Sequence, residues 1–215
     1  MTVFKAFPLH VLFVILLALS TAASAQVFGE SRAGSWYIGG GLGGFSEESN
    51  AQLPGANGKA AGFFGVGFRA SPYVAVEADL IGWRQDFPTP NSIAPAQLAT
   101  ADARTDLSTG GLGGVVKLYM PLDRVDLYAG GGLGIYSTRL EVSGTSGGGA
   151  RVNIEETDDD VGYQLLLGAD VYVSRNFTVG LEYRWLKLDA NFEPFVAGQV
   201  DAGGQFLFAT VRGHF

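Results

Sequence analysis

The last eleven residues of the chain, QFLFATVRGHF (Gln205–Phe215), alternate with the two-residue period of a β-strand. One face of this strand consists of Leu207, Ala209, Val211, Gly213 and Phe215. The other face carries Phe206, Phe208, Thr210, Arg212 and His214. Chain ends in soluble proteins are usually exposed and frayed. A strand that stops on an apolar Phe therefore needs an explanation from the rest of the sequence.

The first 25 residues have the composition of a secretory signal peptide. Lys5 precedes the apolar run VLFVILLALS (Val11–Ser20), and Ala23-Ser24-Ala25 offers small residues for cleavage before Gln26. The apolar run is shorter than the ~20 residues of a spanning helix, which disfavours the alternative of an N-terminal membrane anchor. We therefore expect an exported mature chain of residues 26–215.

The composition narrows the class of protein. The formal net charge is −7, and removing Lys5 with the signal leaves −8 because the signal holds no acid. This negative charge argues against nucleic acid as a partner, since phosphate binding needs a basic surface. Only 16% of the residues are charged, and the chain has 32 Gly and no Cys. An exported, charge-poor chain without disulfides or an apolar run long enough for a spanning helix fits a closed β-barrel.

Eight segments of the mature chain show the strand period, and each is close to the ~9–11 residues that a tilted strand needs to cross a bilayer. They are Ser35–Phe45, Ala60–Arg69, Tyr73–Trp83, Gly110–Met120, Val125–Leu140, Val161–Val173, Phe177–Leu188 and Gln205–Phe215. Three connections are short (RASPY, MPLDR and SRN). The other four are long: Ser46–Lys59, Gln85–Asp106, Ser143–Asp160 and Asp189–Asp201. We therefore expect an eight-stranded antiparallel transmembrane β-barrel with short periplasmic turns, long extracellular loops and both termini periplasmic.

The alternation alone does not decide which face meets lipid, because a soluble lipocalin-type barrel is apolar inside and a membrane barrel is apolar outside. One face is rich in glycine, as at Gly39, Gly41, Gly65 and Gly67. By parity this face also carries Glu77, Asp79, Lys117, Asp170, Glu182, Arg184 and Arg212. A narrow eight-stranded interior takes small fillers beside a few large residues, whereas a solvated face would carry many charges and few glycines. We therefore place this face in the lumen.

These features resemble the family of OmpA-like outer-membrane transmembrane domains, which includes small porin-like and opacity-type surface proteins, over the whole mature chain. The resemblance implies a lumen plugged by acidic and basic side chains, for which the matching positions are Glu77, Lys117, Glu182 and Arg212. OmpA-like proteins can continue into a periplasmic peptidoglycan-binding domain. Here we expect a single barrel domain, and we predict no function as a tether to the cell wall from the resemblance.

The closing strand also resembles the C-terminal signal by which the barrel-assembly machinery recognises its clients. The signal would consist of Phe215, Val211, Ala209 and Leu207, although Gly213 stands where an aromatic or bulky residue is common. Phe215 also fits an interfacial aromatic girdle. Other girdle candidates are Trp36 and Tyr119 at the short-turn rim, and Trp83, Tyr136 and Trp185 at the other.

The sequence gives little support for a catalytic site or a metal-binding loop. After signal removal His214 is the only His, and it has no neighbouring Ser to activate as a nucleophile. The carboxylates Glu77, Asp79 and Glu182 could form an acid–base pair, but the cations of the same face favour structural ion pairs. The acidic run Glu155–Asp160 lacks the ligand spacing and turn Gly of an EF-hand, so we expect a solvated loop. We expect neither a cofactor nor enzymatic activity.

The sequence thus predicts an integral protein of a Gram-negative outer membrane, with a structural or surface-interaction role in the envelope. A narrow channel for small solutes and a loop-mediated adhesin share the fold and stay open. The expected partners are outer-membrane lipid and lipopolysaccharide, the barrel-assembly machinery, and an unidentified external ligand at the loops.

Overall fold

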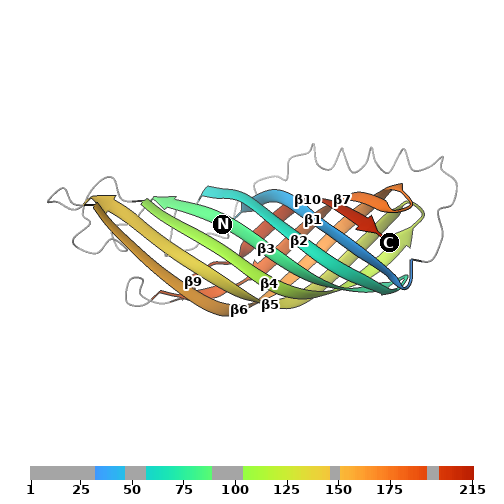
Figure 1. Cartoon of the computed structure of the whole chain (residues 1–215), viewed down its shortest axis with the longest axis horizontal. Coiled ribbons are helices and arrows are strands. Elements are labelled where there is room, and N and C mark those ends of the chain that lie inside the picture. The colour runs from blue at the N-terminus through green and yellow to red at the C-terminus, as the bar shows by residue number, and fades with distance from the viewer. Residues whose placement is uncertain (1–31, 47–56, 89–103, 146–150, 193–198) are drawn as a thin grey trace, which may run out of the picture.

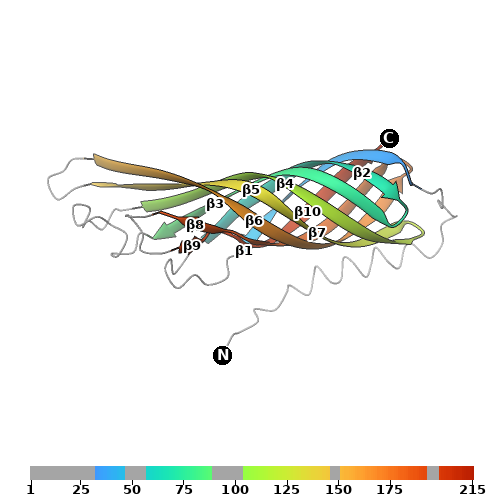
Figure 2. The same cartoon turned by 90° about the horizontal axis from the view of Figure 1, so that it is seen from below.

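A computed structural model describes residues 32–46, 57–88, 104–145, 151–192 and 199–215. Eight strands form a closed barrel in the order β1-β10-β7-β6-β5-β4-β3-β2, and a separate two-stranded sheet pairs β8 with β9 (Figures 1 and 2). The barrel strands are β1 (Ser35–Ser46), β2 (Asn57–Ser71), β3 (Val74–Pro88), β4 (Arg104–Leu122), β5 (Val125–Thr145), β6 (Arg151–Ser174), β7 (Phe177–Lys187) and β10 (Gly204–His214). The small sheet consists of β8 (Asp189–Asn191) and β9 (Gln199–Asp201). The predicted eight-stranded antiparallel barrel is confirmed.

Short turns connect the strands at one rim of the barrel, which we call the short-turn rim. The connections are Pro72-Tyr73, Asp123-Arg124 and Arg175-Asn176. Asp123 adopts a φ of 46°, a left-handed conformation that Asp tolerates better than most residues. The barrel closes here through Trp36 and Phe215, which exchange two backbone hydrogen bonds of 3.0 Å. No helix in the described part of the chain is long and apolar enough to cross a membrane.

The outer wall carries a band of exposed apolar side chains. Leu42 is 78% exposed and Leu133 65%, and similar residues cover β2 to β7 and β10. Strand register marks the upper limit of this band: Ile135 pairs with Val161, whereas the next outward-facing pair is Ser137 with Asp159. A contiguous apolar surface that runs around the barrel wall is unfavourable in water. It is the face that the alternation predicted to meet lipid.

Beyond this band the wall is taller on one side than on the other. β5 and β6 pair as far as Thr145 and Arg151, so their hairpin extends furthest from the short-turn rim (Figures 1 and 2). The prediction of a loop over Ser143–Asp160 is therefore wrong for most of its length, and the acidic run Glu155–Asp160 lies in β6. β3 and β4 likewise extend into the predicted loop Gln85–Asp106. The Asp189–Asp201 connection contains β8 and β9.

The interior is layered rather than polar throughout. Away from the short-turn rim it is filled by apolar side chains from the barrel wall and from the β8–β9 hairpin, including Trp83, Phe192, Phe206 and Phe208. Trp83 and Tyr136 lie inside the barrel at 4% and 0% exposure, and Tyr119 is also buried, so their assignment to lipid-facing girdles is wrong. The inward-facing positions are polar in the middle of the barrel and apolar further from the short-turn rim. The prediction of a polar lumen therefore holds for the middle of the barrel and is wrong for its upper part.

Candidate functional site

The seven charged residues singled out from the sequence all point into the lumen, and none is more than 4% exposed. They come from β3 (Glu77, Asp79), β4 (Lys117), β6 (Asp170), β7 (Glu182, Arg184) and β10 (Arg212). Their alternation with lipid-facing neighbours places each on the inner face of its strand. We call this set the charged layer.

Glu182 is the centre of the charged layer. Its Oε2 lies 3.2 Å from Lys117 Nζ and 2.8 Å from Arg212 Nη2, and its Oε1 lies 2.6 Å from Arg184 Nη2. Three cations therefore surround one carboxylate in a region without solvent exposure. Such contacts offset the cost of removing the charges from water only because the geometry is close and the pairing is multiple.

Each of the three cations also contacts a second acid. Lys117 Nζ lies 2.7 Å from Glu77 Oε2, Arg184 Nη1 2.5 Å from Asp79 Oδ2, and Arg212 Nη1 2.5 Å from Asp170 Oδ1. Ion pairs join the four positions implied by the family resemblance: Glu77 to Lys117, Lys117 to Glu182, and Glu182 to Arg212. The layer thus ties β3, β4, β6, β7 and β10 together across the lumen.

Two of the uncharged residues that contact the charged layer are Tyr128 and Gln164, which were not singled out from the sequence. Tyr128 donates a 3.0 Å hydrogen bond to Glu182 and accepts one of 3.1 Å from Arg212, while Gln164 accepts one of 2.9 Å from Arg184. The ring of Tyr128 lies against its cross-strand partner Gly168, where a Cβ would collide with the ring. Tyr128 could have been predicted from the strand alternation, because it lies on the same face of β5 as Gly130 and Gly132.

A second buried group lies nearer the short-turn rim. Arg69 forms an ion pair with Asp126, and Tyr172 donates a 2.5 Å hydrogen bond to Asp126. The Arg69 guanidinium lies 4.2 Å from the centre of the Tyr119 ring, and that of Arg32 lies 3.5 Å from the Tyr172 ring. The sequence did not single out this group, although Arg69 lies on the same face of β2 as Gly65 and Gly67. The lumen is therefore filled on this side of the charged layer as well.

On the opposite side, aromatic rings cover the charged layer. The Arg184 guanidinium lies 4.6 Å from the centre of the Phe63 ring, and Phe63 packs edge-on against Phe208 at 5.0 Å. Trp83 packs edge-on against Phe206 at 5.1 Å. Ionic and apolar side chains thus fill successive levels of the barrel.

The acids and cations of the charged layer pair with one another at short range, which is typical of a structural ion-pair network. The carboxylates of the charged layer are neutralised by cations at short range, and no group of His, Cys, Asp and Glu among the described residues is arranged to hold a metal ion. His214 lies at the short-turn rim, where its Nε2 is 3.5 Å from the hydroxyl of Thr178.

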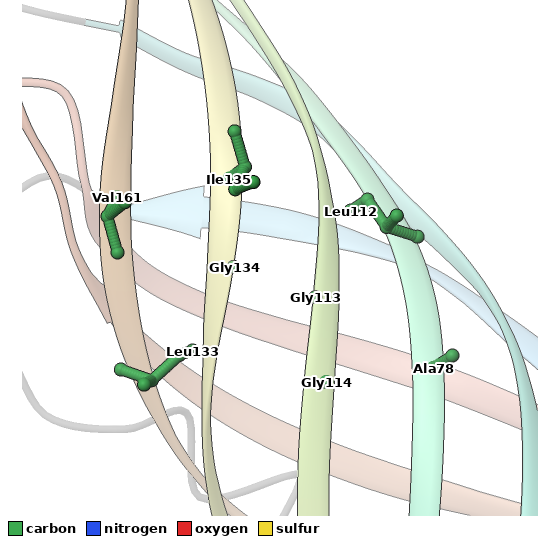
Figure 3. A pocket seen from close by; sticks show the side chains of 8 residues that line it. All are labelled: Ala78, Leu112, Gly113, Gly114, Leu133, Gly134, Ile135 and Val161. Carbon is green, nitrogen blue, oxygen red and sulfur yellow. The ribbon is translucent and has the colours of Figure 1, made fainter.

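The outer wall has a shallow hollow where glycines leave the backbone uncovered. Figure 3 shows it between β3 and β6, with Gly113, Gly114 and Gly134 in its floor and Leu112, Leu133, Ile135 and Val161 around them. It lies within the apolar band, so it belongs to the lipid-facing surface.

The predicted assembly residues lie on that same surface. Phe215 is 71% exposed and Val211 50%, and Ala209 and Leu207 face outward on the same strand. Leu207, Ala209 and Val211 belong to β10, which pairs with β1 and β7 and so closes the barrel, and Phe215 directly follows this strand. Recognition of these residues by an assembly machinery stays a prediction.

Comparison with known proteins agrees with this architecture. A family model described as outer membrane protein beta-barrel domain matches residues 13–208. Among solved structures, OprG of Pseudomonas aeruginosa is similar with a TM-score of 0.56 and 14% identity, covering 88% of this chain and 99% of its own. Neisserial surface protein A gives a TM-score of 0.55 and 18% identity, covering 86% and 99%. The attachment invasion locus protein Ail of Yersinia pestis, in complex with a heparin analogue, gives 0.51 and 12%, covering 85% and 99%. A search of curated proteins found no match.

Proposed function

Because this chain belongs to the family of outer membrane protein β-barrel domains, we propose that it is anchored in the Gram-negative outer membrane and has a structural or surface-interaction role in the envelope. Lipid and lipopolysaccharide contact its apolar band. Its termini face the periplasm, and the tall β4–β6 side of the wall faces the outside. The exposed polar residues beyond the Ile135–Val161 pair support this orientation.

The observation that carries this proposal is the filled lumen. The Arg69–Asp126 group, the charged layer and the apolar side chains around Phe208 follow one another along the barrel axis. Lys117, Arg184 and Phe208 have no exposed surface. A solute path would have to separate the ion pairs of Glu182 and displace the rings of Trp83 and Phe206. A scaffold role needs no such rearrangement, so it is favoured over the alternative of a narrow channel.

A role in surface contact is favoured by the height of the β5–β6 hairpin. The heparin analogue bound by Ail is a polyanion, yet the outer part of β6 here carries five acids and one Arg over Arg151–Asp160. Like charges repel, so an interactive role for this chain points to a different class of ligand.

Cysteine labelling on intact cells tests the proposal, since the natural sequence has no Cys. Asn153→Cys lies on the tall wall and Asp123→Cys at the short-turn rim, and both positions are exposed. A maleimide coupled to a polyethylene glycol too large to cross the outer membrane should label the first variant and not the second. Labelling of Asp123→Cys alone would reverse the orientation and remove the surface role.

A further inference from the structure

Among the strands that the structure describes, none pairs with one edge of the tall wall. β6 begins at Arg151 and pairs with β5 from that residue onward, but its pairing with β7 begins only at Tyr163. In the chain segments that the structure describes, no strand hydrogen-bonds to the other side of β6 between Arg151 and Gly162. The β8–β9 hairpin approaches the lower part of this edge, where Asn191 N donates a 2.7 Å hydrogen bond to Asp158. The open part is Arg151–Thr157, which we call the β6 edge.

The β6 edge lies in water rather than in lipid. It begins beyond the Ile135–Val161 pair that limits the apolar band, and Asn153, Glu155 and Thr157 are exposed. An unpaired edge presents alternate backbone N–H and C=O groups in the geometry of a ladder, so it is a template for another strand. Extended peptides bind folded domains in this way, with backbone hydrogen bonds for affinity and side-chain contacts for specificity.

The side chains around the β6 edge select the charge of the incoming strand. Glu155 and Glu156 lie on its two faces, and Glu155 is directly opposite Glu141 of β5, an arrangement that like charges disfavour. Arg139 forms a 2.5 Å ion pair with Glu155, and both partners are about half exposed. The acids continue below the edge as Asp158, Asp159 and Asp160. A basic strand would relieve this repulsion, whereas the same edge of a second copy would add to it.

We propose that the β6 edge binds an extended segment of another protein, rich in Lys or Arg, by strand addition. Basic residues of the added strand lie beside Glu155 on the outer face. Apolar residues lie beside Ile154, which is half-buried on the inner face. The inference deepens the surface-interaction role proposed above and rests on the tall wall facing outward.

Site-directed disulfide formation tests the geometry of the docked strand. The probe is a nine-residue peptide of alternating Lys and Val with a central Cys, incubated with the full chain folded in lipid nanodiscs and oxidised glutathione. Asn153→Cys places a thiol on the β6 edge. Ser143→Cys is its matched control because Ser143 pairs directly with Asn153 on the same face but lies one strand further from the edge.

Side chains of adjacent strands are about 5 Å apart, and those two strands away about twice that distance, which is too far for a disulfide. We expect at least a tenfold higher cross-linking yield at position 153 than at 143. Equal yields at the two positions would overturn strand addition at this edge.

Two further arms separate strand addition from charge attraction. Methylation of every backbone nitrogen of the peptide keeps its charge and removes its hydrogen-bond donors, so it should abolish cross-linking. Undiminished cross-linking would reduce the interaction to electrostatics and overturn the proposal. The double variant Glu155→Gln/Glu156→Gln should bind the unmodified peptide about fivefold more weakly, whereas Asp123→Asn at the other rim should bind it unchanged.

Two other outcomes would assign the β6 edge to a different partner or to no partner. Efficient disulfide formation between two copies of Asn153→Cys without peptide would replace the basic partner by a second copy of this chain. No peptide binding by a barrel that is labelled from outside at position 153 would overturn the strand-addition site and leave the surface role intact.

Discussion

Lys117 contacts two carboxylates in a part of the lumen that water does not reach. Its Nζ lies 2.7 Å from Glu77 and 3.2 Å from Glu182, and the side chain has no exposed surface. Lys117→Met keeps most of the volume and leaves Glu77 without its cation. We expect the free energy of unfolding to fall by about 3–5 kcal/mol, the usual cost of breaking a buried ion pair on one side. Urea titration in lipid vesicles, followed by Trp fluorescence, measures the loss.

Arg139→Met is the control for this substitution. It breaks the exposed Arg139–Glu155 pair, whose loss should cost at most about 1 kcal/mol. The double variant Glu77→Gln/Lys117→Met should recover part of the loss, because it removes the stranded charge as well. An effect of Lys117→Met no larger than that of Arg139→Met would show that the charged layer is solvated in the membrane.

The two-residue alternation of the strands could predict which charged side chains point into the lumen, but it could not predict which of them form ion pairs with one another. Glu77, Lys117 and Arg212 follow from alternation with apolar neighbours, since each strand has only two faces. Glu182 occupies the centre because the strand register places it at the same height in the barrel as Lys117 of β4 and Arg212 of β10. A single sequence does not reveal this register. Tyr128 was missed because a Tyr among glycines fits a lipid interface as well as a lumen.

Phe215, which directly follows the closing strand β10, has two roles that can be separated experimentally. Phe215 exchanges backbone hydrogen bonds with Trp36, while its side chain is 71% exposed and contributes to the outer surface. Phe215→Ser keeps the backbone pairing and removes the aromatic ring. We expect a lower fraction of assembled barrel in cells, with unchanged export and unchanged stability after refolding in vitro. The gel mobility of unheated samples measures assembly.

Normal assembly of Phe215→Ser in cells would mean that the ring is not read by the assembly machinery. A parallel loss of stability in vitro would instead assign the ring a packing role at the membrane interface.

At the scale of elements, the sequence could predict the eight spanning strands but not their full length. Spanning strands alternate between lipid and lumen and so show a clear period. The outer part of β6 is polar on both faces, as in the run Glu155–Asp160, and therefore reads as a loop. It forms a strand because β5 supplies a partner along its length. The β8–β9 hairpin is too short to be recognised from alternation, and it is held by burial of residues such as Phe192.

For the molecule as a whole, the apolar band sets its depth in the membrane. Leu133 lies inside this band, and Ser137 lies beyond its upper limit on the same face of β5. Leu133→Arg should lower the stability in vesicles by about 2–4 kcal/mol, whereas Ser137→Arg should change it by no more than about 1 kcal/mol. Equal effects in the urea titration would place the membrane boundary elsewhere on the wall.

The central claim is that side chains close the lumen at successive levels, so that the barrel presents a surface instead of passing solutes. Single-channel recording in planar bilayers tests this most directly, with Lys117→Met recorded beside the natural protein. We predict no discrete conductance steps from the natural protein, and none from Lys117→Met, because the rings of Trp83, Phe206 and Phe208 still fill the level above. Steady, reproducible conductance of the natural protein at low voltage would contradict the account.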